Sequence, residues 1–210
     1  MQSGKMDLEA GLLKLYRAPW LLNTTSPDVQ AIMQEMRVQP DDVIIELGAG
    51  DGRYTRPIAR RLEKRSGAGV IFACDFSRRL VDSLSNAINA EEIDVHARAM
   101  CLGDVPSNTL PFEDESANTV LSVNAVQYLG NPMAYLKEIR RVLKPDGVLL
   151  IGDRQSDAND DSQGHSAKEQ VEIVLSILDD IGINTGGQIS LDGFDWVIRA
   201  VRPATVLSES

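Results

Sequence analysis

The feature that most constrains the fold is a regular alternation of short apolar runs with amphipathic segments. The apolar runs are rich in β-branched residues and typical of buried parallel strands; they lie at residues 43–47, 69–75, 95–100, 119–124, 147–152 and 194–201. The amphipathic segments repeat apolar residues at helical spacing and predict helices at residues 55–65, 77–88, 132–143 and 168–181. Turn residues predict chain reversals at 144–147 and 180–187. Strands separated by helices favour an α/β fold, with a parallel sheet covered by helices on both faces.

The length, net charge and cysteine content of the chain favour one soluble domain. With 210 residues, the chain is long enough for one core and too short for two comfortable domains. Its formal net charge of −10 leaves no broad basic surface, which argues against nucleic acid as a partner. Cys74 and Cys101 lie outside any CxxC pattern, so a reducing compartment fits better than a disulfide framework or a zinc site. We see no secretory signal and no membrane-spanning window, and we expect a cytoplasmic protein.

A glycine-rich turn follows the first predicted strand in the sequence ELGAGDG, residues 46–52. A dinucleotide fingerprint would need a third glycine at the position of Arg53, and the chain has no Gly-Lys-Ser/Thr for a phosphate loop. Glycines allow a ligand to approach the backbone closely, and the N–H groups of the next helix suit an anion such as a carboxylate. Glu46 at the strand end suits an ammonium group. The turn therefore provides for both charges of an amino acid.

The second predicted strand ends in Asp75, which is followed by Phe76. A carboxylate at this place suits ribose hydroxyls, and the neighbouring aromatic ring can lie against an adenine. Together with the glycine turn, these residues indicate a nucleoside joined to an amino acid, without a phosphate. S-adenosylmethionine is such a molecule.

Several blocks in this order resemble the class I S-adenosylmethionine-dependent methyltransferases: VIIELGAGDGRYT, ACDFS, and LPFEDESANTVLSVNAVQYLGNPMAYLKEIRRVLKPDGVLLIGD. The resemblance covers about residues 38–154, and the pattern is most similar to the ubiquinone/menaquinone-biosynthesis type. It implies a Rossmann-like, mostly parallel seven-stranded sheet with an antiparallel last strand. It also implies one domain over residues 1–210. We expect an N-terminal helical cap (1–37), a cofactor-binding core (38–154), a mobile polar loop (155–166), and a last helix with closing strands (167–203).

The resemblance also implies roles for individual residues. It assigns the cradle for the methionine end to Glu46, Gly48, Ala49, Gly50 and Gly52. It assigns ribose to Asp75, the adenine surroundings to Phe76, and the adenine amino group to Asp104, flanked by Gly103 and Val105. Asn124 and Ala125, with Val126 after them, are expected beside the sulfonium and its methyl group. Two departures stand out: the spacing from Asp104 to LPF is longer than usual, and a histidine pair common in relatives is replaced by Gln127 and Tyr128.

The catalytic candidates are Tyr128 and His165. Tyr128 suits contact with the acceptor or the sulfonium, with packing at a helix start as the alternative. His165 is a candidate general base in the polar segment, although a lone loop histidine is more often only solvated. His96 is interpreted as structural. No metal site is predicted, because the acidic run DANDDS lacks the glycine and closing glutamate of a calcium loop.

A basic strip follows the glycine turn and is interpreted as the solvated face of a helix; it comprises Arg53, Arg56, Arg60, Arg61, Lys64 and Arg65.

The acceptor stays open at this point. A small molecule or a lipid-like compound is favoured, and methylation of a protein side chain is an alternative. The apolar N-terminal residues, among them Leu12, Trp20 and Leu21, would suit peripheral contact with a membrane. Their mixed charges favour packing on the domain instead. A non-catalytic binding module is the alternative of another class, although both the glycine turn and Asp75 are retained.

Overall fold

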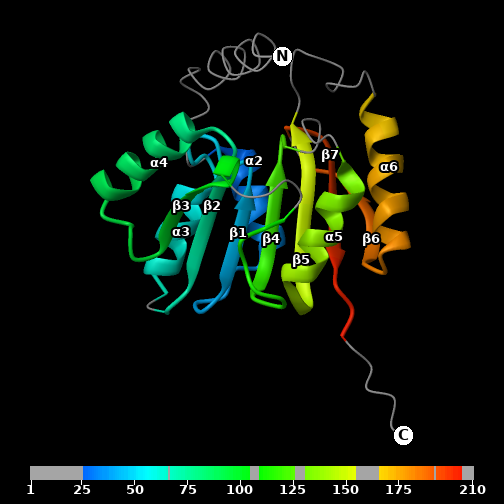
Figure 1. Cartoon of the computed structure of the whole chain (residues 1–210), viewed down its shortest axis with the longest axis horizontal. Coiled ribbons are helices and arrows are strands. Elements are labelled where there is room, and N and C mark those ends of the chain that lie inside the picture. The colour runs from blue at the N-terminus through cyan, green and yellow to red at the C-terminus, as the bar shows by residue number, and fades with distance from the viewer. Residues whose placement is uncertain are drawn as a thin grey trace, which may run out of the picture.

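A computed structural model of the chain describes residues 26–65, 67–104, 109–125, 131–154, 166–191 and 193–204. Its strands form a seven-stranded sheet in the order β3-β2-β1-β4-β5-β7-β6 (Figure 1). The first five pair in parallel, β7 runs antiparallel to β5, and β6 runs antiparallel to β7. The strand bounds are β1 Val43–Leu47, β2 Val70–Asp75, β3 Ala97–Cys101, β4 Ala117–Val123, β5 Leu143–Arg154, β6 Asn184–Ile189 and β7 Phe194–Val201.

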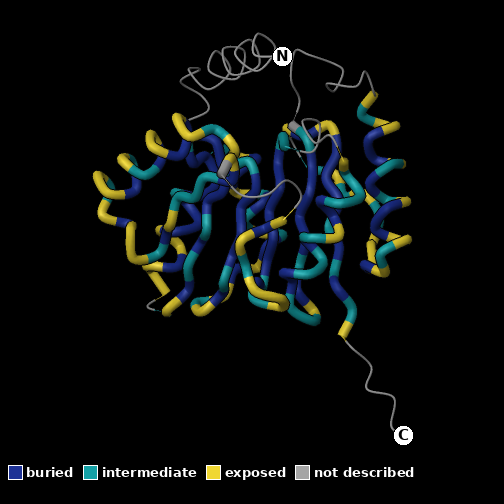
Figure 2. The backbone as a smooth tube through the Cα atoms, viewed as in Figure 1, coloured by how far each residue is buried: buried dark blue, intermediate teal, exposed yellow. Residues whose placement is uncertain are grey.

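Helices cover both faces of this sheet. They are α2 Pro27–Met36, α3 Thr55–Glu63, α4 Arg78–Ala90, α5 Pro132–Val142 and α6 Ala167–Asp180, with a short 3-10 turn, η2, at Leu102–Asp104. Apolar residues of α5 and α6 pack with Ile45 and Val120 in one core cluster. Residues of α2, α3 and α4 pack with Ile44 and Leu121 in the other. Because neighbouring strand residues point to opposite faces, the inner strands supply residues to both clusters. Figure 2 shows the strands buried between helices with exposed outer sides.

The predicted fold class is confirmed, with two local errors. The predicted chain reversal at 180–187 includes residues 184–187, but these form β6 at the edge of the sheet together with Gln188 and Ile189. Its residues are mostly exposed, so the strand has no apolar pattern and its pairing with β7 defines it. The predicted reversal at 144–147 lies within β5. There Asp146 has the positive φ of 62° that is typical of a turn. Its N–H donates to the Arg202 carbonyl at 2.8 Å, so a turn-like backbone conformation lies inside β5.

Parts of the predicted organisation fall outside the described residues. They are residues 1–25 of the expected N-terminal cap and most of the expected loop, together with Val105, Val126, Gln127, Tyr128 and His165. Within the described ranges, no helix is long and apolar enough to cross a membrane.

Candidate active site at the carboxyl edge of the sheet

The glycine turn leaves β1 at the carboxyl edge of the sheet, where open α/β sheets bind ligands. The φ angles of Gly48, Gly50 and Gly52 are 81°, 57° and 87°, values that other residues rarely adopt. The N–H groups of Gly48 and Ala49 donate to the Cys74 carbonyl at 2.8 and 3.0 Å, which ties the turn to the end of β2. The turn is therefore a backbone cradle held open by its glycines.

The end of β4 lies directly against this cradle. A Cβ atom at Gly48 would be 2.7 Å from the Cβ of Ala125, so the close approach also requires a glycine. Asn124 has a φ of 55°, and its N–H donates to the Gly152 carbonyl at 3.0 Å. The structure thus brings the predicted methionine cradle and the predicted sulfonium neighbours together.

Asp75 joins β2 to the glycine turn. Its Oδ2 accepts a hydrogen bond from Gly50 N at 2.9 Å, and its Oδ1 accepts one from Ser77 N at 2.9 Å. Burial raises the pKa of Asp75 above its ordinary value, although these backbone donors act in the opposite direction. A carboxylate has about four lone-pair sites, so the two backbone bonds leave capacity for hydroxyl groups. Asp75 can both shape the turn and bind a ribose.

The predicted adenine surroundings lie beside Asp75. The side chain of Phe76 is 61% exposed, an unusual state for a large apolar group. A Cβ at Gly103 would be 2.9 Å from the Phe76 carbonyl oxygen, so η2 packs closely on this backbone. Asp104 ends η2, while its side chain lies outside what the structure describes. An exposed phenyl ring next to a close-packed turn can form a stacking surface for a planar base.

Glu46 lies beneath the turn and is only 2% exposed. Its Oε2 accepts a hydrogen bond from Thr55 Oγ1 at 2.5 Å. Burial raises the pKa of Glu46 to about 8, opposed by the Thr55 hydrogen bond and reinforced by the charges of Asp75 and Asp51. A buried carboxylate of this kind ionises readily only when a cation comes close. Glu46 is therefore suited to an ammonium group.

Asp51 is a site residue that the sequence reasoning missed. Its Oδ1 is buried and has no hydrogen-bond partner among the described residues. Burial raises its pKa, and a hydrogen bond from its own backbone N–H, followed by the charges of Arg56 and Arg53, partly counteracts that rise. A buried acceptor without a partner is costly, so this oxygen is suited to a donor on a ligand. The available signal was its position between two glycines of the cradle.

The interpretation of the basic strip as a solvated helix face is wrong at its start. Arg53 is 7% exposed, and its Nη2 lies 2.7 Å from Oδ2 of the equally buried Asp28 in α2. The same nitrogen donates to Ser26 Oγ at 3.0 Å. Further along, Arg56 and Arg60 both pair with Glu91 after α4. Arg53 thus fastens α2 to the glycine turn at the position where a dinucleotide fold carries glycine.

Of the remaining candidate residues, the structure describes one, and three lie outside the described ranges. The His96 ring nitrogen Nδ1 lies 2.8 Å from the Gly69 carbonyl oxygen, which supports the structural interpretation. Tyr128, His165 and Val105 lie outside the described residues. Within the parts that the structure describes, no group of three or more His, Cys, Asp or Glu side chains could hold a metal ion.

A family model for a methyltransferase domain matches residues 45–151, about half of the chain. The chain belongs to this family. It is similar to a dimethylglycine N-methyltransferase of Parasynechococcus marenigrum, with 30% identity over 71% of this chain and 51% of that protein. It is 29% identical to a demethylmenaquinone methyltransferase of Tropheryma whipplei, over 58% of this chain and 46% of that protein. The chain thus spans about half the length of each of these two, and 34% and 40% of the length of two other curated relatives.

Solved structures agree on the fold. A SAM-dependent methyltransferase from Aquifex aeolicus superposes with a TM-score of 0.74 and 19% identity, over 92% of this chain and 97% of that one. The resemblance drawn from the sequence is confirmed for the family and the fold: the chain belongs to the methyltransferase-domain family and has the fold of the class I S-adenosylmethionine-dependent methyltransferases. The residues present fit that cofactor, because the cradle is free of side chains at its glycines and Asp51 has a buried oxygen in need of a donor.

Proposed function

We propose that this chain transfers a methyl group from S-adenosylmethionine to a small organic acceptor, a class that includes lipid-like compounds. The observation that supports this proposal best is the arrangement of three carboxylates, Glu46, Asp51 and Asp75, around a glycine turn. The charges of Asp75 and Asp51 raise the pKa of Glu46, so the three carboxylates interact electrostatically. A cofactor that carries an ammonium and a sulfonium charge suits such a site.

Each part of the cofactor has a partner in this proposal. Glu46 and Asp51 hold the ammonium group, and the N-terminal N–H groups of α3 face the carboxylate. Asp75 holds the ribose hydroxyls. Phe76 and η2, with Gly103, Asp104 and Val105, surround the adenine. Asn124 and Ala125 flank the sulfur.

The cofactor supplies a methyl group that its positive sulfur already activates. The contribution of the protein is then to place donor and acceptor in line and to exclude water. Ala125 bears directly on this placement, because it packs against Gly48 and so fixes the distance between β4 and the cradle. A group that removes a proton is needed if the acceptor is a hydroxyl, a protonated amine or a carbon acid, and much less for a thiol.

Tyr128 and His165 remain our candidates for contact with the acceptor. Tyr128 follows β4 by five residues in the sequence, and His165 immediately precedes Ser166, the N-cap of α6. If His165 accepts the proton, His165→Ala should lower kcat and remove a pH-dependent limb near the ordinary pKa of histidine, about 6.5. The binding of S-adenosylmethionine should stay unchanged in that variant. An unchanged pH profile of kcat would contradict the role.

Two measurements test the proposed function. Calorimetry should show S-adenosylmethionine binding with one site per chain, and Asp75→Asn should weaken it while the exposed-site control Glu63→Gln should not. Transfer of a radiolabelled methyl group into a fractionated extract then identifies the acceptor. Label in the small-molecule or lipid fraction supports the proposal. Label in protein favours the side-chain alternative, and binding without any label favours a non-catalytic module; either result overturns the proposal.

A further inference from the structure

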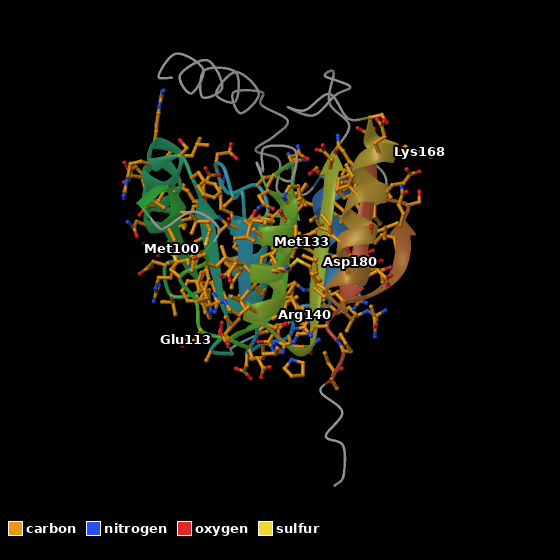
Figure 3. All side chains as sticks on the ribbon, turned by 45° about the vertical axis from the view of Figure 1, so that its right-hand side comes forward. Met100, Glu113, Met133, Arg140, Lys168 and Asp180 are labelled. Atoms are coloured by element: carbon orange, nitrogen blue, oxygen red, sulfur yellow. The ribbon has the colours of Figure 1, made fainter. Side chains whose placement is uncertain are left out.

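A cavity of about 370 Å³ lies at the opposite edge of the sheet from the cofactor cradle. Its walls come from the segment before β4, the last turns of α5, the end of α6 and the residue after β7. Figure 3 labels Met133 and Arg140 near the two ends of α5 and Lys168 and Asp180 near those of α6, and it shows that both helices end on the same side of the molecule. The cavity is therefore separate from the methyltransferase site.

Four of the residues that line this cavity are cationic, in a chain whose formal net charge is −10. They are Lys137, Arg140, Arg141 and Arg202. Three carboxylates, Asp114, Glu115 and Asp180, line the same cavity, so the charge that each cation offers depends on its partner. The four cations differ in whether a carboxylate neutralises them.

Arg141 and Arg202 are engaged in structural contacts. Arg141 forms ion pairs with Asp114 at 2.7 Å and Glu138 at 2.8 Å, and it also donates to the carbonyls of Phe112 and Leu110. These contacts hold the segment before β4 against α5.

Arg202 forms an ion pair with Glu115 at 2.5 Å and donates to the carbonyl oxygens of Arg140 and Leu143. It therefore takes up the last carbonyl groups of α5, where a cation is favoured by the helix dipole. The helix dipole at the end of α5 therefore already has a cation in Arg202.

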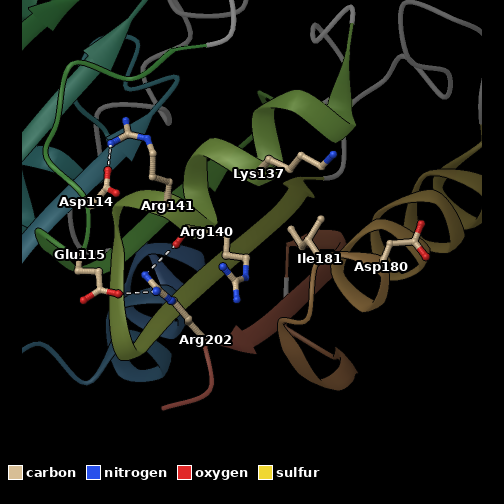
Figure 4. Close-up of a pocket in the computed structure, with 8 residues that line it drawn as sticks. All are labelled: Asp114, Glu115, Lys137, Arg140, Arg141, Asp180, Ile181 and Arg202. Atoms are coloured by element: carbon tan, nitrogen blue, oxygen red, sulfur yellow. Dashed lines mark hydrogen bonds and ion pairs between the residues drawn. The ribbon is translucent and has the colours of Figure 1, made fainter. Parts of the chain in front are cut away.

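Arg140 differs from these two arginines. Its Nε is buried and has no hydrogen-bond partner among the described residues. In Figure 4 its guanidinium lies in the cavity between Arg202 and Ile181. Native structures rarely leave a buried charged donor without a partner, and each such group calls for an explanation. Lys137, one turn earlier, is exposed and forms no ion pair with any described residue.

We propose that this cavity binds the phosphate group of a small molecule, or inorganic phosphate itself. The planar guanidinium of Arg140 presents a fork of N–H donors that matches two phosphate oxygens, and Lys137 adds a compact charge beside it. The volume lies within the range of small-molecule sites. Asp180 lines the far wall, and its carboxylate opposes an anion.

The negative charge of Asp180 should repel an anionic ligand, so removal of that charge tests whether the ligand is an anion. Asp180→Asn should tighten phosphate binding several-fold, because it removes a negative charge from the wall. If Arg140 instead turned to pair with Asp180 in solution, wild-type protein would bind no phosphate, and that result would overturn the proposal.

The experiment titrates the full-length chain, with S-adenosylmethionine present, against inorganic phosphate and pyrophosphate at constant ionic strength in calorimetry. Wild type should bind with one saturable site. Arg140→Gln should weaken binding at least tenfold, and Arg140→Lys should give an intermediate affinity, since it keeps the charge but loses the fork. Arg61→Gln is the matched control, because Arg61 is exposed on α3, away from the cavity, and it should bind like wild type.

Two outcomes would overturn the inference: no saturable binding by wild type, or an equal loss in Arg61→Gln. A phosphorylated sugar titrated in parallel separates the two sources, because a metabolite site binds it more tightly than free phosphate. Thermal unfolding of each variant shows that the fold is intact. The affinity for S-adenosylmethionine should be unchanged in Arg140→Gln, so this test is independent of the proposed methyl transfer.

Discussion

Replacement of Glu46 by glutamine should separate binding of the cofactor from stability of the fold. The carboxyl is 2% exposed and its pKa is raised to about 8, chiefly by burial. At pH 7 about one tenth of the ligand-free molecules would then carry the charge that attracts an ammonium group. Binding must shift the remaining molecules to the ionised form, so cofactor binding at pH 7 should release about 0.9 of a proton per chain.

This coupling predicts the pH dependence of the affinity. Between pH 6 and pH 7 the affinity for S-adenosylmethionine should rise about tenfold, since each unit below the pKa of Glu46 reduces the ionised fraction about tenfold. The gain should end near pH 8, where Glu46 is about half ionised and a ligand α-amino group has lost about half of its protons. In Glu46→Gln the affinity at pH 8 should be lower than in wild type and nearly independent of pH between 6 and 7.

The effect on stability has the opposite direction. The pKa of Glu46 in the folded chain lies above its ordinary value of 4.5, so its contribution to stability is complete below pH 4.5 and is lost as pH rises to about 8. The loss is on the order of 4 kcal/mol for the ligand-free protein. Glutamine cannot ionise, so Glu46→Gln should unfold at higher urea concentration than wild type at pH 8, and at a similar concentration at pH 5.

Calorimetry in two buffers of different ionisation enthalpy measures the proton release, and urea unfolding measures the stability. Glu63→Gln on α3 is the matched control, because this carboxylate is exposed and should change neither quantity. The reasoning is refuted if wild type binds the cofactor with the same affinity at pH 6 and pH 7. It is also refuted if Glu46→Gln retains the proton release.

Three further substitutions test the cradle. Asp51→Asn should weaken cofactor binding by about tenfold or more, as expected for one hydrogen bond to a charged group. An unchanged affinity in calorimetry would show that the buried oxygen does not bind the cofactor. Arg53→Ala should lower the free energy of unfolding by about 3–5 kcal/mol because it breaks the buried ion pair with Asp28. The double variant with Asp28→Ala should recover part of this loss in urea, and a double variant no more stable than Arg53→Ala would contradict the explanation. Gly48→Ala should reduce both the free energy of unfolding and the affinity for the cofactor. Gly182 is the matched control, because it has a φ of 68° but an added Cβ would meet no atom within 4 Å; Gly182→Ala should lower the free energy of unfolding only by the backbone strain, about 1 kcal/mol.

The sheet was largely predictable because its strands bury both faces. Strands that lie between two others are buried and rich in apolar residues. β1, which is parallel to both of its neighbours, and β7, which is antiparallel to both, therefore have the predicted bounds. β6 escaped prediction because an edge strand with exposed residues can tolerate polar side chains and glycines. Its position follows from pairing with β7, which is a property of the folded sheet and leaves no periodicity in the sequence.

The site was predictable where chemistry restricts the backbone. Alternating glycines and a carboxylate at the end of the next strand identify the cradle, and the structure places Asp75 in contact with Gly50. Arg53 was not predictable in this way. Its burial depends on Asp28, which is 25 positions away in α2, and a charged residue in a basic run ordinarily faces solvent. Asp51 was missed for a related reason, since burial of one carboxylate oxygen depends on the surrounding fold.

Three carboxylates whose pKa values are all raised by burial form an environment that favours positive charge in its ligand. Without a cation, ionisation of these groups opposes the fold. A cationic ligand removes that opposition, so part of its binding energy comes from relief of an unfavourable state in the ligand-free protein. Loss of the methyl group converts a charged sulfonium into a neutral thioether. The same carboxylates should therefore hold the product less tightly than the donor, and this difference should diminish in Glu46→Gln. Product and donor affinities that change equally in that variant would show that Glu46 does not sense the charge on sulfur.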